Sequence, residues 1–171
     1  MNKMNDTDRQ QFAELYESAF PADERRPTAD ELALDDNRFE IAIVRHNKQF
    51  AGFVTTWHFD KFVYIEHFAT LPELRGNGIG RRTLETLLAQ NKLPFVLEVE
   101  PPTDTLKTRR MAFYRRAGFH EMPQAYIQPP YHAAVQSLPL RLMTTSNDMS
   151  NTFFDEIRKT LYSEVYKVSQ P

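Results

Sequence analysis

Apolar residues recur at helical spacing near the beginning of the chain and stop at Pro21. The apolar positions are Phe12, Leu15, Tyr16, Ala19 and Phe20. A capping-box spacing at 7–10 precedes them, so the pattern predicts a helix over 7–20. A second capping-box spacing at 28–31 predicts a short helix that ends near residue 35.

Three stretches rich in Ile, Val and Phe follow at residues 39–45, 49–58 and 62–70. Short polar turns separate each stretch from the next. Turns of this length join antiparallel neighbours, because a parallel crossover needs a much longer connection. The pattern therefore predicts an antiparallel meander.

The second half of the chain alternates between helical and strand patterns. The expected elements are a helix to about 91, a strand at 95–99, a helix at 105–117 and strands from 119 onward, the last at 138–143. The adjacent prolines within 124–137 favour a loop or a broken hairpin there. A meander followed by strand, helix and strand predicts an α/β (α+β) fold with a mixed central sheet of about six strands and flanking helices.

Two helices predicted in the second half of the chain also have an apolar face. The expected inner face of the helix at 105–117 consists of Leu106, Arg110, Phe113, Tyr114 and Ala117. A C-terminal helix is expected at about 147–168, where Phe153, Ile157 and Leu161 begin one stripe. We expect it to pack on its own domain, although its tyrosine-rich flanks leave a homodimer contact open, so both monomer and homodimer are compatible with the sequence.

Composition narrows the class of protein. A chain of 171 residues fits a single domain over 1–171, with a core at 39–142. A formal net charge of −2 argues against binding nucleic acid through phosphate contacts. There is no cysteine, so thiolate metal sites and acyl-cysteine intermediates are excluded. The sequence shows neither a membrane-spanning run nor an apolar leader, so we expect no membrane association and a cytoplasmic location.

Three of the five glycines lie between a predicted strand and a predicted helix, at Gly76, Gly78 and Gly80. Glycine allows positive φ and close approach of a ligand, and the N–H groups of the first helical turn favour an anion. Arg75 and Arg81 add positive charge. The turn suits an extended anion such as a pyrophosphate.

A dinucleotide fingerprint is an alternative interpretation of these glycines. G-x-G-x-x-G counted from Gly76 places Arg81 in the third position, and counted from Gly78 it places Thr83 there. Glu98 nevertheless stands where a ribose-binding acid would stand, so a dinucleotide-binding protein stays open as the less favoured alternative.

The same stretch resembles a known family. Arg75-x-x-Gly78-x-Gly80, after a strand that ends at Thr70, is similar to the acyl-CoA-binding motif of the GNAT superfamily of N-acetyltransferases. Downstream, the run 113–119, Phe-Tyr-Arg-Arg-Ala-Gly-Phe, resembles the family's FY-x-x-x-GF helix ending. The two motifs stand in the family's order, and the resemblance covers roughly residues 39–142.

The resemblance implies acetyl-CoA as co-substrate, without a metal ion. Arg75 and the backbone of the glycine turn would hold the pyrophosphate, and the end of the preceding strand would pair with the pantetheine arm, much as a strand adds to a sheet edge. The residues so implied are Phe68, Ala69, Thr70, Arg75, Gly76, Asn77, Gly78, Ile79, Gly80 and Arg81. An Asn that family members carry in the next helix has no match here, where Lys107 stands nearest.

Acetyl transfer to an amine needs a proton acceptor for the amine and a proton donor for the leaving thiolate. Glu66 is the first candidate for the base, because it stands inside an apolar strand and burial raises the pKa of a carboxyl group. Alternation in a strand leaves a solvent-facing Glu66 equally open, and it places His67 on the opposite face. Glu98 is the second carboxylate, with a structural pairing to Arg109 or Arg110 as its alternative role.

The proton donor and the acceptor pocket are further expectations. The resemblance assigns Tyr114 as the acid for the CoA thiolate, with a plain core aromatic as the alternative. Glu24 and Tyr131 are candidates for the acceptor pocket, since loop residues carry binding functions more often than core residues do.

These inferences converge on one function. We expect an acyltransferase of GNAT type that moves acetyl from acetyl-CoA to a primary amine by direct attack in a ternary complex, with a small-molecule or peptide acceptor. A non-catalytic acyl-CoA-binding regulator is the main alternative.

Overall fold

The computed structural model describes residues 4–132 and 136–169. The chain divides into two compact units, residues 1–93 and 94–171. The single domain over 1–171 stays a prediction, and residues 133–135 of the expected loop at 124–137 lie outside the described residues.

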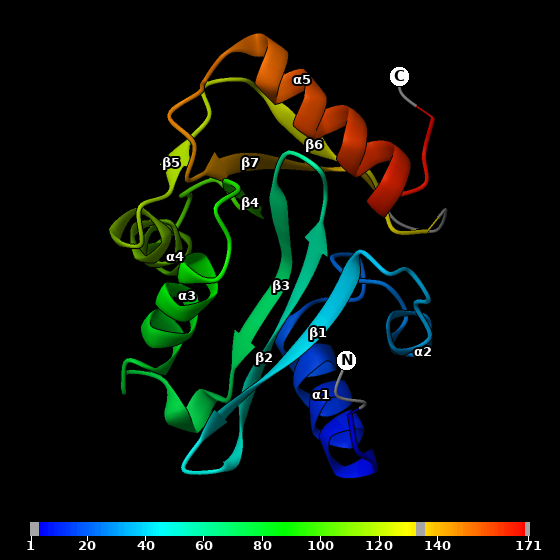
Figure 1. Cartoon of the computed structure of the whole chain (residues 1–171), viewed down its shortest axis with the longest axis vertical. Helices are drawn as coiled ribbons and strands as arrows, with labels where there is room; N and C mark the ends of the chain where they lie inside the picture. The colour runs from blue at the N-terminus through cyan, green and yellow to red at the C-terminus, as the bar shows by residue number, and fades with distance from the viewer. Residues whose placement is uncertain (1–3, 133–135, 170–171) are drawn as a thin grey trace. The chain divides into compact units, whose positions relative to one another are not determined.

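The first unit contains the predicted helices and the predicted meander (Figure 1). Its elements are α1 (Asp6–Ala19), α2 (Thr28–Leu32), β1 (Phe39–His46), β2 (Gln49–His58), β3 (Val63–Thr70), the 3-10 turn η1 (Pro72–Leu74) and α3 (Ile79–Ala89). Strand β2 pairs antiparallel with both β1 and β3. The expected meander is therefore confirmed.

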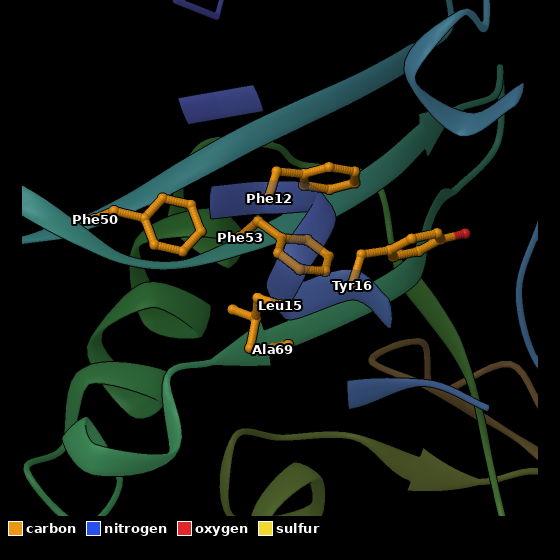
Figure 2. Packing of buried hydrophobic residues seen from close by; sticks show 6 residues of the cluster. All are labelled: Phe12, Leu15, Tyr16, Phe50, Phe53 and Ala69. Carbon is orange, nitrogen blue, oxygen red and sulfur yellow. The ribbon is translucent and has the colours of Figure 1, made fainter. Parts of the chain in front are cut away.

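Helix α1 packs its apolar stripe on the strands of this unit. Figure 2 shows Phe12, Leu15 and Tyr16 of α1 facing Phe53 of β2 and Ala69 of β3. The rings of Phe12 and Phe53 lie 4.5 Å apart, centroid to centroid. Burying side chains of this size contributes roughly 1.5–3 kcal/mol each, which holds α1 against β2 and β3.

Both predicted capping boxes are wrong. Helix α1 is capped by Asn5, whose side chain accepts a hydrogen bond of 2.8 Å from the Asp8 N–H. Helix α2 has no side-chain cap. Glu31, the expected reciprocal partner in the second box, is 1% exposed and contacts side chains from other elements instead.

The second unit is organised around β7. Its elements are β4 (Phe95–Val99), α4 (Thr105–Arg116), β5 (His120–Glu121), β6 (Tyr126–Gln128), β7 (Leu138–Thr144), α5 (Asn151–Thr160) and the π-helical turn η2 (Leu161–Val165). Strands β4, β5 and β6 each pair antiparallel with β7. The short β6 confirms the expected broken hairpin.

The C-terminal helix packs on its own unit, as predicted. Figure 1 shows α5 running along β6 and β7. The Tyr162 hydroxyl donates a hydrogen bond of 2.5 Å to the Ile127 carbonyl oxygen. The rings of Phe154 and Tyr126 meet edge to face.

The expected inner face of α4 is wrong by about one position. Met111 is the residue of α4 that is buried, at 1% exposure, whereas Leu106 is 67% exposed. The helix begins at Thr105, and the side chain of its N-cap Asp104 accepts a hydrogen bond from the Lys107 N–H.

Candidate functional site

The glycine turn has the backbone geometry that its sequence predicts. Gly76 and Gly78 have φ of 84° and 72°, and Gly78 is the N-cap of α3. Arg75 and the two glycines are exposed. The N–H groups of the first turn of α3 have no partner within the helix, so this exposed helix start offers donors to an anion.

Two polar side chains near the turn contact different neighbours. Asn77 donates from its amide nitrogen to the Leu74 carbonyl oxygen at 3.3 Å, which ties the turn to η1. Arg81 pairs with Glu85 at 3.3 Å on the exposed side of α3. The implied binding of acyl-CoA by these residues stays a prediction.

A glycine in β2 explains why the end of β3 lies where it does. Gly52 is opposite Thr70, and a Cβ atom built on Gly52 would lie 2.2 Å from the Ala69 carbonyl oxygen. Only glycine allows so close an approach. Gly52 was missed by the sequence reasoning, although a glycine inside an apolar strand is a recognisable sign of close backbone contact.

A β-bulge decides how β3 presents its polar side chains. Thr55 pairs with His67 and Thr56 pairs with Ile65, so Glu66 is the extra residue of β3. At a bulge, strict alternation of side chains fails. The prediction that Glu66 and His67 point to opposite faces is therefore wrong, because their side chains join one cluster.

Glu66 lies in that cluster with both carboxylate oxygens engaged. Oε1 accepts from Nη1 of Arg26 at 2.6 Å, and Oε2 accepts from the indole Nε1 of Trp57 at 2.7 Å. The Glu66 side chain has no exposed surface. The predicted burial is confirmed, and the solvent-facing alternative is wrong.

The same Arg26 nitrogen reaches a second buried carboxylate. Nη1 donates to Glu31 Oε2 at 2.9 Å, while Glu31 Oε1 has no hydrogen-bond partner and lies 3.7 Å from His67 Nδ1. Oxygens of Glu31 and Glu66 approach within 4.8 Å. Two charges at that distance repel by about 3.5 kcal/mol at an effective dielectric constant near 20, so the cluster needs compensating cations.

His67 lies beside these carboxylates. Its Nε2 lies 3.3 Å from the Glu24 carbonyl oxygen, and its Nδ1 faces Glu31. Burial opposes the charged ring, but the facing Glu31 carboxylate and the charge of Glu66 outweigh it and raise the pKa of His67. Burial likewise opposes the charged form of Glu31, but His67 and Arg26 outweigh it and lower the pKa of that carboxyl.

One atom each of Glu31, Glu66 and His67 would be close enough to share a metal ion. The Arg26 guanidinium already lies between the two carboxylates and carries the positive charge there. We therefore interpret the cluster as an ion-pair network.

Glu98 lies in a separate network in the second unit. It accepts hydrogen bonds from the Tyr126 hydroxyl, from Gln128 Nε2 at 2.6 Å and from the Tyr166 hydroxyl at 2.5 Å. Burial, together with the charge of Glu98, raises the pKa of Tyr126 well above its usual value. These hydrogen bonds join β4, β6 and the C-terminal segment, so Glu98 links elements of the second unit.

The expected pairing of Glu98 with Arg109 or Arg110 is not what the structure shows. Arg110 pairs with Glu100 at 2.8 Å, and Lys107 pairs with the same carboxylate at 3.0 Å. These two cations of α4 are thus partly neutralised within their own unit.

Tyr114 packs among aromatic side chains in the second unit. Its ring lies 5.2 Å from that of Phe113 and 5.8 Å from that of Phe119, centroid to centroid. Burial raises the pKa of Tyr114 to about 12, although the nearby charge of Arg110 opposes it. Such a phenol is a weaker acid than free tyrosine but keeps its proton, and so remains a hydrogen-bond donor, at neutral pH.

The two candidates for the acceptor pocket lie in different units. Glu24, in the first unit, offers its carbonyl oxygen to His67. Tyr131, in the second unit, packs against the ring of Tyr166 in a tilted arrangement, with 5.0 Å between the ring centroids. Their roles toward an acceptor stay predictions.

Comparisons with known proteins agree with this architecture. A model of the Acetyltransferase (GNAT) family matches residues 9–119. A solved structure described as "Putative acetyltransferase from GNAT family", from Bacteroides thetaiotaomicron, is 38% identical and superposes with a TM-score of 0.88 over 97% of each chain. The chain belongs to the GNAT family of acetyltransferases.

Two further comparisons are more distant. "Putative acetyltransferase YjbC" from Bacillus subtilis (strain 168) is 31% identical over 102 residues, which are 58% of this chain and about half (52%) of that protein. A structure of an aminoglycoside 6'-N-acetyltransferase complexed with coenzyme A has a TM-score of 0.63 at 14% identity, covering 84% of this chain and 93% of that one. The second likeness shows the fold alone.

The family membership confirms the predicted fold class and the prediction that the chain is an acyltransferase. Within residues 4–132 and 136–169, no helix combines the length and the apolar character needed to cross a bilayer.

Proposed function

We propose that this chain transfers acetyl from acetyl-CoA to a primary amine by direct attack in a ternary complex. The observation that carries the proposal is the exposed start of α3, where the left-handed glycines 76 and 78 precede the first helical N–H groups, which have no partner within the helix, beside Arg75. In a chain of this family, that anion site suits the pyrophosphate of CoA. A distant structural neighbour was solved with coenzyme A, in agreement with this choice of co-substrate.

The end of β3 is the proposed site for the pantetheine arm. Gly52 fixes the backbone of Ala69 and Thr70 against β2. A rigid strand end can pair with an extended ligand through its N–H and C=O groups. The proposed contacts come from Phe68, Ala69 and Thr70.

Glu66 is the proposed proton acceptor for the amine. A carboxylate offers about four lone-pair sites, so hydrogen bonds from Arg26 and Trp57 do not by themselves prevent it from accepting a proton directly or through water. Glu98 is the weaker candidate, because its hydrogen bonds to two tyrosines and Gln128 serve the packing of its own unit.

Tyr114 is proposed as a hydrogen-bond donor to the leaving thiolate. Its pKa of about 12 lies some 3.5 units above that of an ordinary thiol, near 8.5. Complete proton transfer from the phenol would therefore be uphill by about 5 kcal/mol. A hydrogen bond stabilises the thiolate without that cost, and solvent supplies the proton.

A non-catalytic acyl-CoA-binding regulator is the second candidate function. The observation that favours it is the ion pair between Glu66 and Arg26, since it gives Glu66 a structural partner. Turnover of an amine acceptor distinguishes the acetyltransferase from the regulator.

The test is release of CoA thiol from acetyl-CoA with a panel of primary amines: a polyamine, an aminoglycoside and peptides with a free α-amino group. Glu66→Gln should lose roughly 10²–10⁴-fold in kcat with acetyl-CoA affinity retained. Tyr114→Phe should lose up to about tenfold, the equivalent of one neutral hydrogen bond. The matched control is Glu40→Gln, the same substitution at an exposed residue of β1.

Each outcome decides between the candidates. Turnover by the parent chain that fails in Glu66→Gln but not in Glu40→Gln supports the enzyme with Glu66 as base. Turnover that survives in Glu66→Gln removes Glu66 from the mechanism. Tight binding of acetyl-CoA without turnover of any amine supports the regulator.

A further inference from the structure

The buried charged cluster of the first unit contains charged residues in addition to the proposed base, Glu66. Its charged and titratable members are Arg26 from the segment between α1 and α2, Glu31 from α2, and Glu66 and His67 from β3. The side chains of Glu31 and Glu66 have no exposed surface, and that of Arg26 is 12% exposed. Burying such charges is costly unless each is compensated, so their arrangement calls for an explanation.

One nitrogen holds the two carboxylates together. Arg26 Nη1 donates to Glu66 Oε1 at 2.6 Å and to Glu31 Oε2 at 2.9 Å. Glu31 is thus the anchor that fixes the guanidinium, and the guanidinium in turn fixes Glu66. Removing the Arg26 charge would leave two buried carboxylates repelling each other.

The opposite side of Glu66 is fixed by Trp57. Its indole N–H donates to Oε2 at 2.7 Å, and its ring lies under the Arg26 guanidinium, with 5.7 Å from Cζ to the ring centroid. The indole is 1% exposed. Donors on both oxygens restrict the carboxylate to one orientation.

His67 faces the second carboxylate of the cluster. Its Nδ1 lies 3.7 Å from the Glu31 oxygen that Arg26 does not contact. Tyr16 also faces the cluster, and burial together with the charges of Glu31 and Glu66 raises the pKa of its phenol, so it contributes no charge. The Arg26 guanidinium is therefore the cation that contacts both carboxylates.

We propose that Arg26 is a positioning residue that orients the Glu66 carboxylate for proton abstraction, with the buried Glu31 as its anchor. This inference rests on the proposed function, because it assigns Glu66 a proton-accepting role. It places a positioning residue in the segment that precedes α2, and this residue acts through Glu66.

The first test uses the intact chain without an acceptor. Trp57 is the single tryptophan of the sequence, so its indole N–H gives one resonance in a ¹⁵N-labelled sample. In Arg26→Gln that resonance should move upfield, and its hydrogen exchange should accelerate by at least about tenfold, the equivalent of one charge-assisted hydrogen bond. Arg26→Lys, which keeps the charge, should restore part of the protection.

A neighbouring arginine provides the matched control. Arg25 donates from Nε to the Phe20 carbonyl oxygen at 3.0 Å and lies over Tyr16, away from Glu66. Arg25→Gln removes the same charge from the same segment and should leave the Trp57 signal unchanged. Should Arg26→Gln not fold, Glu31→Gln takes its place, because it removes the anchor and leaves Arg26 present.

The second test separates positioning from binding. With an amine that turns over, Arg26→Gln should lower kcat on the order of 100-fold, as a misplaced catalytic group does, with the KM for acetyl-CoA within twofold of the parent value. Arg26→Lys should recover part of kcat.

The outcomes distinguish this inference from the proposed function. An unchanged Trp57 signal in Arg26→Gln, or equal changes in Arg25→Gln and Arg26→Gln, overturns the positioning of Glu66 by Arg26. If Arg26→Gln alters the Trp57 signal but keeps the kcat of the parent chain, the proposed role of Arg26 in catalysis is overturned. A parent chain that turns over no amine fails the proposed function and, with it, the catalytic consequence, even where the Trp57 signal shows Arg26 holding Glu66.

Discussion

Replacing Tyr166 by Phe tests the account of Glu98 as a structural residue. The Tyr166 hydroxyl donates to Glu98 Oε2 at 2.5 Å and accepts from Gln128 Nε2 at 2.9 Å. Phenylalanine has the same shape apart from the hydroxyl, so no cavity forms. The variant loses the hydrogen bond to a charged acceptor, which is worth about 1.5–3 kcal/mol, while Gln128 Nε2 loses the tyrosine oxygen but still donates to Glu98.

Tyr162→Phe is the matched comparison. The Tyr162 hydroxyl donates to a neutral acceptor, the Ile127 carbonyl oxygen. Tyr162 is 7% and Tyr166 is 5% exposed, so burial is nearly equal. A bond to a neutral acceptor contributes about 0.5–1.5 kcal/mol, so the expected loss is about half that of Tyr166→Phe.

The assay is urea unfolding followed by far-ultraviolet circular dichroism, with thermal melting as a second measure. In a chain of this length, about 1 kcal/mol lowers Tm by roughly 2–4 °C, so a loss of about 1.5–3 kcal/mol in Tyr166→Phe should lower it by about 3–12 °C. An equal loss of stability in the two variants, or a larger loss in Tyr162→Phe, would refute the interpretation that Tyr166 donates its hydrogen bond to a charged Glu98 carboxylate.

The remaining predictions concern the first unit. Gly52→Ala should destabilise the chain by about 1–3 kcal/mol in urea and weaken acetyl-CoA binding, because the new Cβ meets the Ala69 carbonyl oxygen at 2.2 Å; unchanged stability would contradict the close approach. The raised pKa of His67 stabilises the fold fully below its ordinary value near 6.5 and loses that contribution as pH rises through the raised value. Stability should therefore decline above about pH 6.5, by an amount that urea unfolding across pH measures. In His67→Gln this decline should be reduced, and an identical profile would refute the assignment.

Local patterns in the sequence were sufficient to predict the glycine turn. Gly78 lies before a helix with a clear apolar stripe, and the left-handed φ and the start of α3 follow from those neighbours. The meander was predictable for the same reason, since its strands are joined by short turns.

Long-range contacts account for what the sequence did not predict. Glu31 fits a capping box by spacing, yet it binds Arg26 inside the unit, because a buried carboxylate must be compensated. Glu66 and His67 share a cluster only because a bulge breaks the alternation of β3. A bulge depends on pairing with β2, so no local pattern reveals it.

The face of α4 illustrates a related limit. Leu106 matches the apolar stripe by spacing but is exposed, whereas Met111 is buried. Helical spacing alone leaves the rotation of a helix uncertain by a residue when apolar side chains are few. The packing of the unit, which buries Met111, determines that rotation.

Isothermal titration of the chain with acetyl-CoA and, separately, with CoA tests whether the glycine turn is the CoA site. We expect micromolar binding that is lost in Arg75→Ala and in Gly78→Val, because the first removes a cation and the second strains a residue with φ of 72°. Arg9→Ala, at an exposed position of α1, should bind as the parent does. Absence of heat and of thermal stabilisation with both ligands, or full binding by both turn variants, would contradict the assignment of the glycine turn as the CoA site.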